Sequence, residues 1–355
     1  MLVYISTFVS PHTLPLGIAL SNHYQKVVFI NTAELTQERK QMGYAVEDPR
    51  VEIRNLSEDR EGCLQLILDA RDVILAGARF DLITQRIYAG KQVFLAHERI
   101  FKKGIIKLLD PRTWKMIKFF RSVKNAPVYF LAIGENAAKD FRRLGFCKDK
   151  IFHFGYFPRM EQYTPQQREK TDPHKLLWVG RFVDCKRPLM ALKAFRKLDD
   201  SYTLTMVGDG KLHDKARAYA EKHNLPVQFL GNISADEVKN QMLSHSILLS
   251  TSHKGEGWGA VINEGMNCGC AVVCAEEIGS AGFLATCDNA VVFKTNSVRD
   301  LCRAIEEAAE RYEALGEAGY KTITEQFNAE IAAARFAALA KEGKVFESGI
   351  GSKVF

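Results

Sequence analysis

The chain of 355 residues has no long hydrophobic run. No stretch approaches the ~18 consecutive apolar residues that a membrane-spanning helix needs. Residues 1–6 contain neither the basic segment nor the small-residue cleavage site of a secretory signal peptide. We therefore expect a cytoplasmic protein without a transmembrane helix.

The sequence also lacks the patterns of a disulfide framework or a metal site. Its eight cysteines form no C-x-x-C pair with histidines nearby, and there is no clear Asp-x-Asp signature. Cys268, Cys270 and Cys274 lie in an apolar run typical of a buried strand, where a thiol acts as a small hydrophobic group. We expect reduced, structural thiols and no metal ion.

The formal charge of +7 is modest, but its placement is uneven. Between residues 99 and 124 the only acid is Asp110, and the basic residues are Arg99, Lys102, Lys103, Lys107, Arg112, Lys115, Lys118, Arg121 and Lys124. Such a local excess of cations indicates a local partner.

Short β-branched runs alternate with helical patterns through both halves of the chain. In the first half the pattern predicts a helix at 135–144 and strands at 2–6, 27–30, 73–75, 93–96, 128–132 and 151–154. In the second half it predicts helices at 188–197, 212–223, 235–244, 261–267 and 300–312, with strands at 175–179, 202–207, 227–230, 247–250, 271–274 and 290–293. The fold class is therefore α/β, with two Rossmann-like, doubly wound parallel sheets.

The division of the chain follows from this alternation. We predict an N-terminal domain at 1–158, a polar linker at 159–174 and a C-terminal domain at 175–314. The Ala-rich residues 315–355 are predicted to form helices that pack back on the N-terminal domain. Open α/β sheets bind ligands at the carboxyl ends of their strands, so both domains are expected to offer loops to a central cleft.

Two acids in a glycine-rich context are the first candidate site residues. Glu256 lies in a loop with Gly257 and Gly259, after a predicted strand, and Glu264 lies about one turn into the next helix. Glycines let backbone N–H groups approach a ligand, and carboxylates suit the vicinal hydroxyls of a sugar or ribose. The alternative is that the acids only favour the N-terminus of that helix.

Two cations lie at the end of the first strand of the second half. Arg181 follows Gly180, and Lys186 comes five residues later. Fixed cations there are suited to stabilising a diphosphate leaving group. Solvated loop cations are the alternative. Gly208 and Gly231 end the next two predicted strands, and they give weaker support because ordinary turns also explain them.

The order G-R-x4-K, V-G-D-G, F-L-G and E-G-W-G-x-V-I-N-E-G-M-N-x-G resembles the family 4 glycosyltransferases, which are retaining enzymes of the GT-B fold. The resemblance implies that Arg181 and Lys186 hold the donor diphosphate and that Glu264 holds the ribose. It implies that Glu256 contacts the donor sugar, with Gly257, Trp258 and Gly259 beside it. In such enzymes no metal is required.

In the first half the resemblance is weaker. His97 resembles the N-terminal-domain histidine that faces the donor sugar, although a lone histidine at a strand end is more often structural. Residues 7–12 depart from the family's paired-glycine loop, which leaves roles for Ser10 and His12 open. The retaining step is expected to be front-face attack by the acceptor hydroxyl, with the departing phosphate accepting its proton.

The basic window of residues 99–124 interleaves its cations with Trp114, Ile117, Phe119 and Phe120. Such segments bind anionic membrane surfaces. Nucleic-acid binding and an ordinary solvated helix face are the alternatives, and we favour the membrane.

The predicted function is transfer of a sugar from a nucleotide sugar, with UDP favoured, to a lipid-linked or surface-polysaccharide acceptor at the inner membrane face. A sugar-nucleotide epimerase and a non-catalytic nucleotide-sugar-binding protein are the alternatives.

Overall fold

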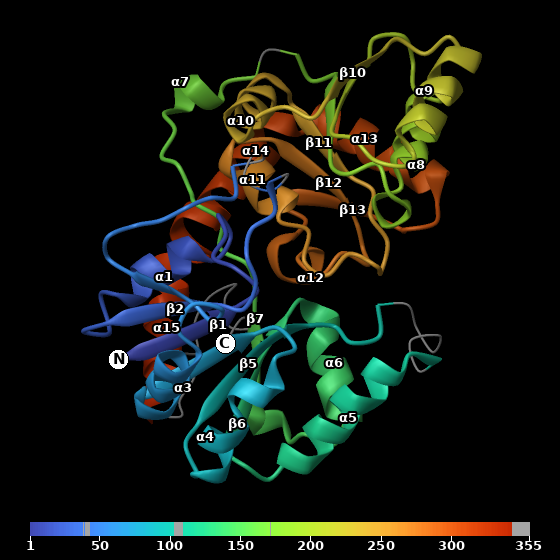
Figure 1. Cartoon of the computed structure of the whole chain (residues 1–355). Helices are drawn as coiled ribbons and strands as arrows, with labels where there is room; N and C mark the ends of the chain where they lie inside the picture. The colour runs from blue at the N-terminus through green and yellow to red at the C-terminus, as the bar shows by residue number, and fades with distance from the viewer. Residues whose placement is uncertain (38, 40–42, 103–108, 171, 343–355) are drawn as a thin grey trace. The chain divides into compact units, whose positions relative to one another are not determined.

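A computed structural model describes residues 1–37, 39, 43–102, 109–170 and 172–342 (Figure 1). The chain forms two compact units. The first combines Met1–Arg159 with the C-terminal segment from Asn328, and the second spans Met160–Phe327. The chain thus changes unit near residues 159 and 327, whereas the predicted boundaries lie at 158, 174 and 314.

The first unit is built on a seven-stranded sheet in the order β3-β2-β1-β4-β5-β6-β7, with every neighbouring pair parallel. The strands are β1 (Leu2–Ser6), β2 (Val27–Asn31), β3 (Glu52–Asn55), β4 (Asp72–Ala76), β5 (Val93–Glu98), β6 (Val128–Ile133) and β7 (Ile151–Phe154). Its α-helices are α1 (Leu14–Leu20), α3 (Arg60–Asp69), α4 (Thr84–Tyr88), α5 (Pro111–Val123), α6 (Glu135–Arg143) and α15 (Ala329–Glu342).

The second unit has a six-stranded sheet in the order β10-β9-β8-β11-β12-β13, also parallel throughout. The strands are β8 (Lys175–Val179), β9 (Thr203–Val207), β10 (Val227–Gly231), β11 (Ile247–Ser250), β12 (Ala271–Ala275) and β13 (Ala290–Phe293). The α-helices are α7 (Pro165–Arg168), α8 (Pro188–Phe195), α9 (His213–Lys222), α10 (Ala235–Ser244), α11 (Val261–Asn267), α12 (Ala281–Leu284), α13 (Val298–Glu310) and α14 (Tyr312–Lys321).

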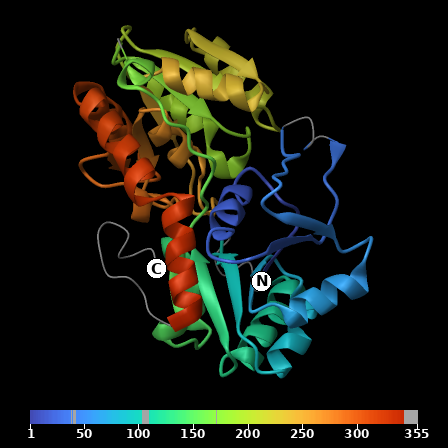
Figure 2. The ribbon, with the colours of Figure 1, turned by 90° about the vertical axis from the view of Figure 1, so that its left-hand side faces the viewer.

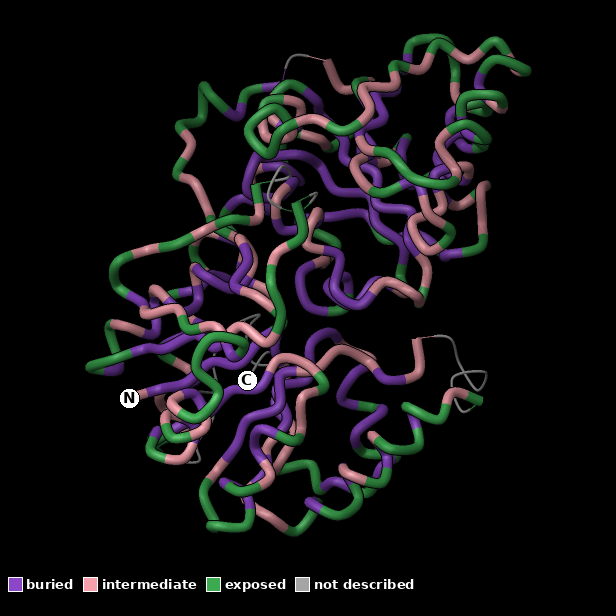
Figure 3. The backbone as a smooth tube through the Cα atoms, viewed as in Figure 1, coloured by how far each residue is buried: buried purple, intermediate pink, exposed green. Residues whose placement is uncertain are grey.

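The strands form the cores of both units (Figure 3). All five residues of β1 and of β12 are buried, as expected for parallel strands covered on both faces. The predicted α/β class with two doubly wound parallel sheets is confirmed. The prediction missed β3, and it ran one helix to residue 312, where α13 ends at Glu310 and α14 begins at Tyr312.

The C-terminal helix α15 belongs to the first unit. It packs against α1 (Figure 2). The buried ring of Phe336 meets Phe94 of β5 edge to face, with 4.9 Å between ring centroids. The Nε2 atom of Gln92 donates to the carbonyl of Ala340 at 3.1 Å. Helix α15 therefore contributes to the core of the first unit, although it follows the second unit in sequence.

The side chains of Cys268, Cys270 and Cys274 are buried, as the apolar run predicts. Burial raises the pKa of Cys268 and of Cys274 to about 12, and that of Cys270 to about 11. These side chains are consequently protonated and serve as packing groups.

Across the described ranges, none of the helices combines the length and the apolar character needed to cross a bilayer.

Candidate functional site

The predicted site residues of the second unit lie where its strand order reverses. The chain runs from β8 outward through β9 and β10, then returns to the other side of β8 with β11. The loops after β8 and after β11 therefore leave from neighbouring strands at the same edge. This is the usual ligand-binding position in an open α/β sheet.

Lys186 and Glu256 meet in an ion pair at this position. The Lys186 Nζ atom lies 2.5 Å from Glu256 Oε2, and the side chains are 19% and 16% exposed. The hydroxyl of Ser252 also donates to Glu256 Oε2, at 3.2 Å. One of the two predicted cations and one of the two predicted acids are thus in direct contact.

Thr251 links the loop after β8 to the loop after β11 through hydrogen bonds. Its hydroxyl donates to the carbonyl of Lys186 at 2.8 Å and accepts from the indole N–H of Trp178 at 3.0 Å. The backbone N–H of His253 donates to the carbonyl of Cys185 at 3.0 Å. The sequence analysis did not predict a role for Thr251 or Ser252. The available signal was their position between a buried strand and Glu256.

Three glycines close the other side of the site. The N–H of Gly208 donates to the carbonyl of Gly231 at 2.7 Å, and the N–H of Gly180 donates to the carbonyl of Val207 at 3.0 Å. Gly208 has a φ of +117°, and a Cβ there would lie 2.2 Å from the carbonyl oxygen of Gly180. Glycine at 208 is therefore required by close backbone approach, beyond what an ordinary turn demands.

The remaining predicted residues of this unit lie on the same two loops or on the adjoining helix. Arg181 is exposed after β8, and Glu264 is half-buried in α11. Gly257 and Gly259 are buried in the loop before that helix, and Gly259 has a φ of +87°. The structure thus gathers the predicted cations and acids at one edge of the sheet.

Trp258 supports this loop from inside the unit. Its indole is 1% exposed, donates to Asn263 Oδ1 at 2.8 Å and stacks on Phe327 with 5.5 Å between centroids. Its carbonyl accepts the N–H of Ser280 at 2.9 Å. The side chain fixes the loop's shape, which leaves only its backbone for contact with a ligand.

His97 belongs to the first unit, at the end of β5. Its Nδ1 atom lies 2.6 Å from the carbonyl oxygen of Glu98, and its ring meets Phe120 and Phe141 edge to face. Because a carbonyl only accepts, Nδ1 carries the proton, and Nε2 has a lone pair. Burial lowers the pKa of His97, so the imidazole is neutral at pH 7. Its predicted role toward the donor sugar stays a prediction.

Within the basic window of residues 99–124, helix α5 has an outer and an inner face. Residues 103–108, with Lys103 and Lys107, lie outside the described residues. In α5 the buried side chains are Thr113, Ile117, Phe120 and Val123, and the exposed cations are Arg112, Lys115, Lys118 and Arg121. Phe119 stacks on Phe80 at 4.4 Å. Most of the apolar residues of α5 therefore face the core, whereas Trp114 (54% exposed) and Leu109 (83%), which precedes the helix, face outward.

In the part of the chain that the structure describes, no group of three or more His, Cys, Asp and Glu side chains is placed to hold a metal ion.

Residues 159–322, which contain this site, match the family described as glycosyl transferases group 1. Two proteins of Methanocaldococcus jannaschii named as uncharacterized glycosyltransferases are similar in sequence. MJ1178 is 33% identical over 43% of this chain and 44% of its own length. MJ1069 is 25% identical over 66% of this chain and 62% of its own length. The similarity thus spans less than two thirds of either relative.

The solved structure of Alr3699/HepE from Anabaena in complex with UDP has a similar fold. It gives a TM-score of 0.71 at 14% identity and covers 95% of this chain and 98% of that one. The same protein has also been solved with UDP-glucose. With two parallel sheets of the expected kind, this likeness confirms the GT-B fold. Residues 159–322 therefore match the glycosyl transferases group 1 family within a chain of GT-B fold.

Proposed function

We propose that the chain is a retaining glycosyltransferase that takes a sugar from a nucleotide sugar, with UDP as the carrier. The acceptor is a lipid-linked or surface-polysaccharide saccharide at the cytoplasmic face of the membrane. The observation that carries the proposal is the Lys186–Glu256 ion pair at the switch point of the second sheet, inside the region that matches the family. The UDP and UDP-glucose complexes of HepE support UDP as the carrier.

The ion pair suggests how the donor is bound. A donor diphosphate offers Lys186 a doubly charged partner, and a sugar hydroxyl offers Glu256 a hydrogen-bond donor. Each side chain thus exchanges one charged partner for a group of the same substrate. Because the two side chains pair with each other, neither charge is left unsatisfied in the free protein, although both are largely shielded from water.

The same cation serves the reaction. As the bond between the sugar and the diphosphate breaks, negative charge grows on the leaving phosphate. Lys186 and the exposed Arg181 stabilise that charge without a metal ion. Glu264 binds the ribose hydroxyls, and Nε2 of His97 accepts a hydrogen bond from the donor sugar.

Retention follows if the acceptor hydroxyl attacks from the face that the diphosphate leaves. The departing phosphate oxygen then accepts the acceptor's proton, so no carboxylate nucleophile is needed. The protein contributes position and charge stabilisation. Retained configuration in the product, read by the anomeric proton coupling in NMR, checks this step.

Substitution of Lys186 and Glu264 tests the site. We expect Lys186→Ala to weaken UDP binding about 10- to 100-fold, because a charge-assisted contact is lost. Glu264→Ala should lower transfer by a similar factor. Lys193→Ala, which removes an exposed lysine of α8, is the matched control and should change neither. Isothermal titration with UDP-, GDP- and ADP-sugars and a transfer assay to lipid extracts, with and without EDTA, supply the measurements.

The outcomes separate the alternative functions. Full transfer by both Lys186→Ala and Glu264→Ala would show that the site is misassigned. Turnover of the donor without any acceptor indicates an epimerase. Donor binding without transfer to any extract indicates a binding protein.

A further inference from the structure

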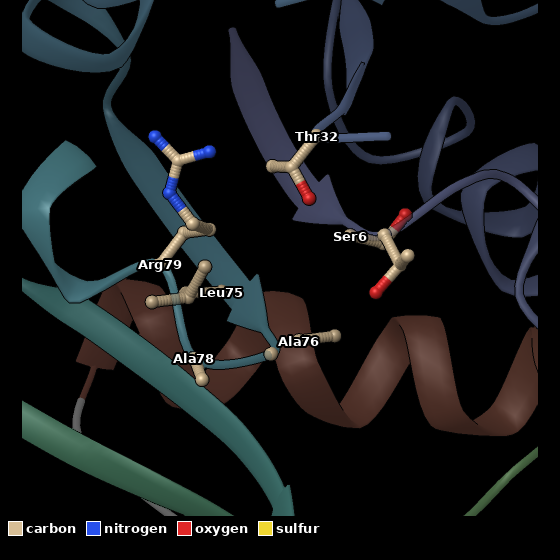
Figure 4. Close-up of a pocket in the computed structure, with 8 residues that line it drawn as sticks. Ser6, Thr32, Leu75, Ala76, Ala78 and Arg79 are labelled. Atoms are coloured by element: carbon tan, nitrogen blue, oxygen red, sulfur yellow. The ribbon is translucent and has the colours of Figure 1, made fainter. Parts of the chain in front are cut away.

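The first unit has its own switch point, and a pocket lies there. Its strand order reverses between β1 and β4, which pair in register with Ser6 opposite Ala76. The pocket is lined by Ser6, Thr7, Thr32, Leu75, Ala76, Gly77, Ala78 and Arg79, all from the carboxyl ends of β1, β2 and β4 or the loops that follow (Figure 4). It occupies the position at which such sheets bind ligands.

The volume of the pocket limits what it can hold. It encloses about 230 Å³. Sites for whole drug-sized ligands run to roughly 300–1,000 Å³, so the pocket does not hold a whole nucleotide sugar. One sugar ring, or one substituent of a larger glycan, is of suitable size.

A buried hydroxyl in the pocket wall lacks a hydrogen-bond partner. Ser6 is 5% exposed, and its Oγ atom has no partner among the described residues. A buried polar group without a partner is costly, so this position of the pocket wall is not optimised for stability alone. Thr32 places a second hydroxyl in the same wall (Figure 4).

The opposite wall carries a fixed cation. Arg79 donates from Nε and Nη2 to the two carboxylate oxygens of Asp81, at 2.9 and 2.8 Å. A second cation, Arg60, lies 3.9 Å from the same carboxylate, so the cluster keeps an excess positive charge. Asp81 occupies two of the five N–H groups of the Arg79 guanidinium, which leaves the others for a ligand. The pairing also raises the pKa of Arg79, so it is always charged.

Gly77 leaves the floor of the pocket open. Its φ is +148°, and no atom lies within 4 Å of the position where a Cβ would stand. A ligand can therefore approach the backbone closely at this point.

We propose that this pocket binds one sugar unit of the acceptor and that this unit carries an anionic group, a carboxylate or a phosphate. The anion contacts Arg79, and a hydroxyl of the sugar contacts Thr32. The assignment to the acceptor rests on the proposed function. The preference for an anion rests only on the residues of the first unit.

Binding of small sugars tests the preference. Glucuronate, glucose 6-phosphate and glucose are titrated into the full chain by isothermal calorimetry, with and without saturating UDP. We expect both anionic sugars to bind at least about tenfold more tightly than glucose, because a charge-assisted hydrogen bond exceeds a neutral one. UDP should leave this difference unchanged, because it occupies the second unit.

Arg79→Gln is expected to remove the preference while glucose binding stays the same. The matched control is Arg50→Gln, because Arg50 makes the same two-bond contact with Asp48 away from the pocket. It should keep the preference. Ala78→Leu, which adds bulk at the pocket wall, should weaken the binding of all three sugars. Thermal melting of each variant verifies that it folds.

The results distinguish this inference from the proposed function. If UDP binds but the anionic sugars bind no better than glucose, the inference is wrong and the function stands. If Arg79→Gln still binds anionic sugars more tightly than glucose, the inference is also wrong. If the preference follows Arg79 but no nucleotide sugar binds, the pocket stands and the proposed function fails.

Discussion

A side chain at position 208 would have no room beside the loop that carries Arg181. The carbonyl of Gly180 lies 2.2 Å from the ideal Cβ position, and the φ of +117° disfavours any other residue. At Gly231, by contrast, φ is +65° and no atom lies within 4 Å of the ideal Cβ. The two glycines therefore test packing and backbone strain separately.

We predict that Gly208→Ala destabilises the second unit by about 3 kcal/mol, since it combines a steric clash with an unfavourable φ. Gly231→Ala should cost only about 1 kcal/mol, because it has the strain without the clash. Urea unfolding of the two variants measures the difference. Equal costs would contradict the close approach of the loops after β8 and β9.

At the scale of the element, α5 shows how one helix divides its residues between two environments. Asp110 accepts the N–H of Arg112 at 2.9 Å, and Pro111 occupies the first turn, so the start of the helix is well defined. Ile117 and Phe120 then pack into the core. The outer face keeps cations, and we propose that this face binds the anionic membrane surface.

The membrane proposal predicts a charge-dependent effect. Replacing Lys115, Lys118 and Arg121 with Gln should weaken binding to anionic liposomes about 100-fold, from about 1 kcal/mol per cation. The control replaces Lys211, Lys215 and Lys222, exposed cations in or beside α9 of the second unit, and should bind as the wild type does. Sedimentation at rising salt measures both. Liposome binding that does not change with salt or with anionic lipid content would contradict the membrane proposal.

The one strand that the sequence analysis missed, β3, also belongs at this scale. Its residues Glu52–Asn55 are mostly polar and only partly buried, because β3 lies at the edge of the sheet. Edge strands are commonly polar, which protects them from pairing with other chains. An apolar pattern could not reveal it.

On the scale of the whole molecule, the first unit is discontinuous in sequence. Its sheet is made by the first 159 residues, yet α15 comes after the entire second unit. Phe336 of α15 is completely buried against Phe94. The stability of the first unit therefore depends on the end of the described chain.

We predict that Phe336→Ala destabilises the first unit by about 3–5 kcal/mol. Hydrogen exchange should become faster in α1, β1 and β5 and stay unchanged in β8 and β11. The matched control is Leu301→Ala, which opens a cavity at a fully buried position of α13. It should speed hydrogen exchange in β12 and β13, which α13 contacts, and leave exchange in β1 and β5 unchanged. Equal acceleration in both units would mean that they unfold as one.

The sequence alone was enough to predict the fold class, the strands of both sheets except β3, and the loops that carry Lys186 and Glu256. It could do so because buried parallel strands are continuous apolar runs, and because glycine and charged residues at their ends form a local pattern. The supporting role of the buried Trp258 and the existence of the pocket beside Ser6 could be seen only in the tertiary structure. Whether an indole supports a loop or lines it, and whether three strand ends enclose a hollow, depends on packing between residues far apart in the chain.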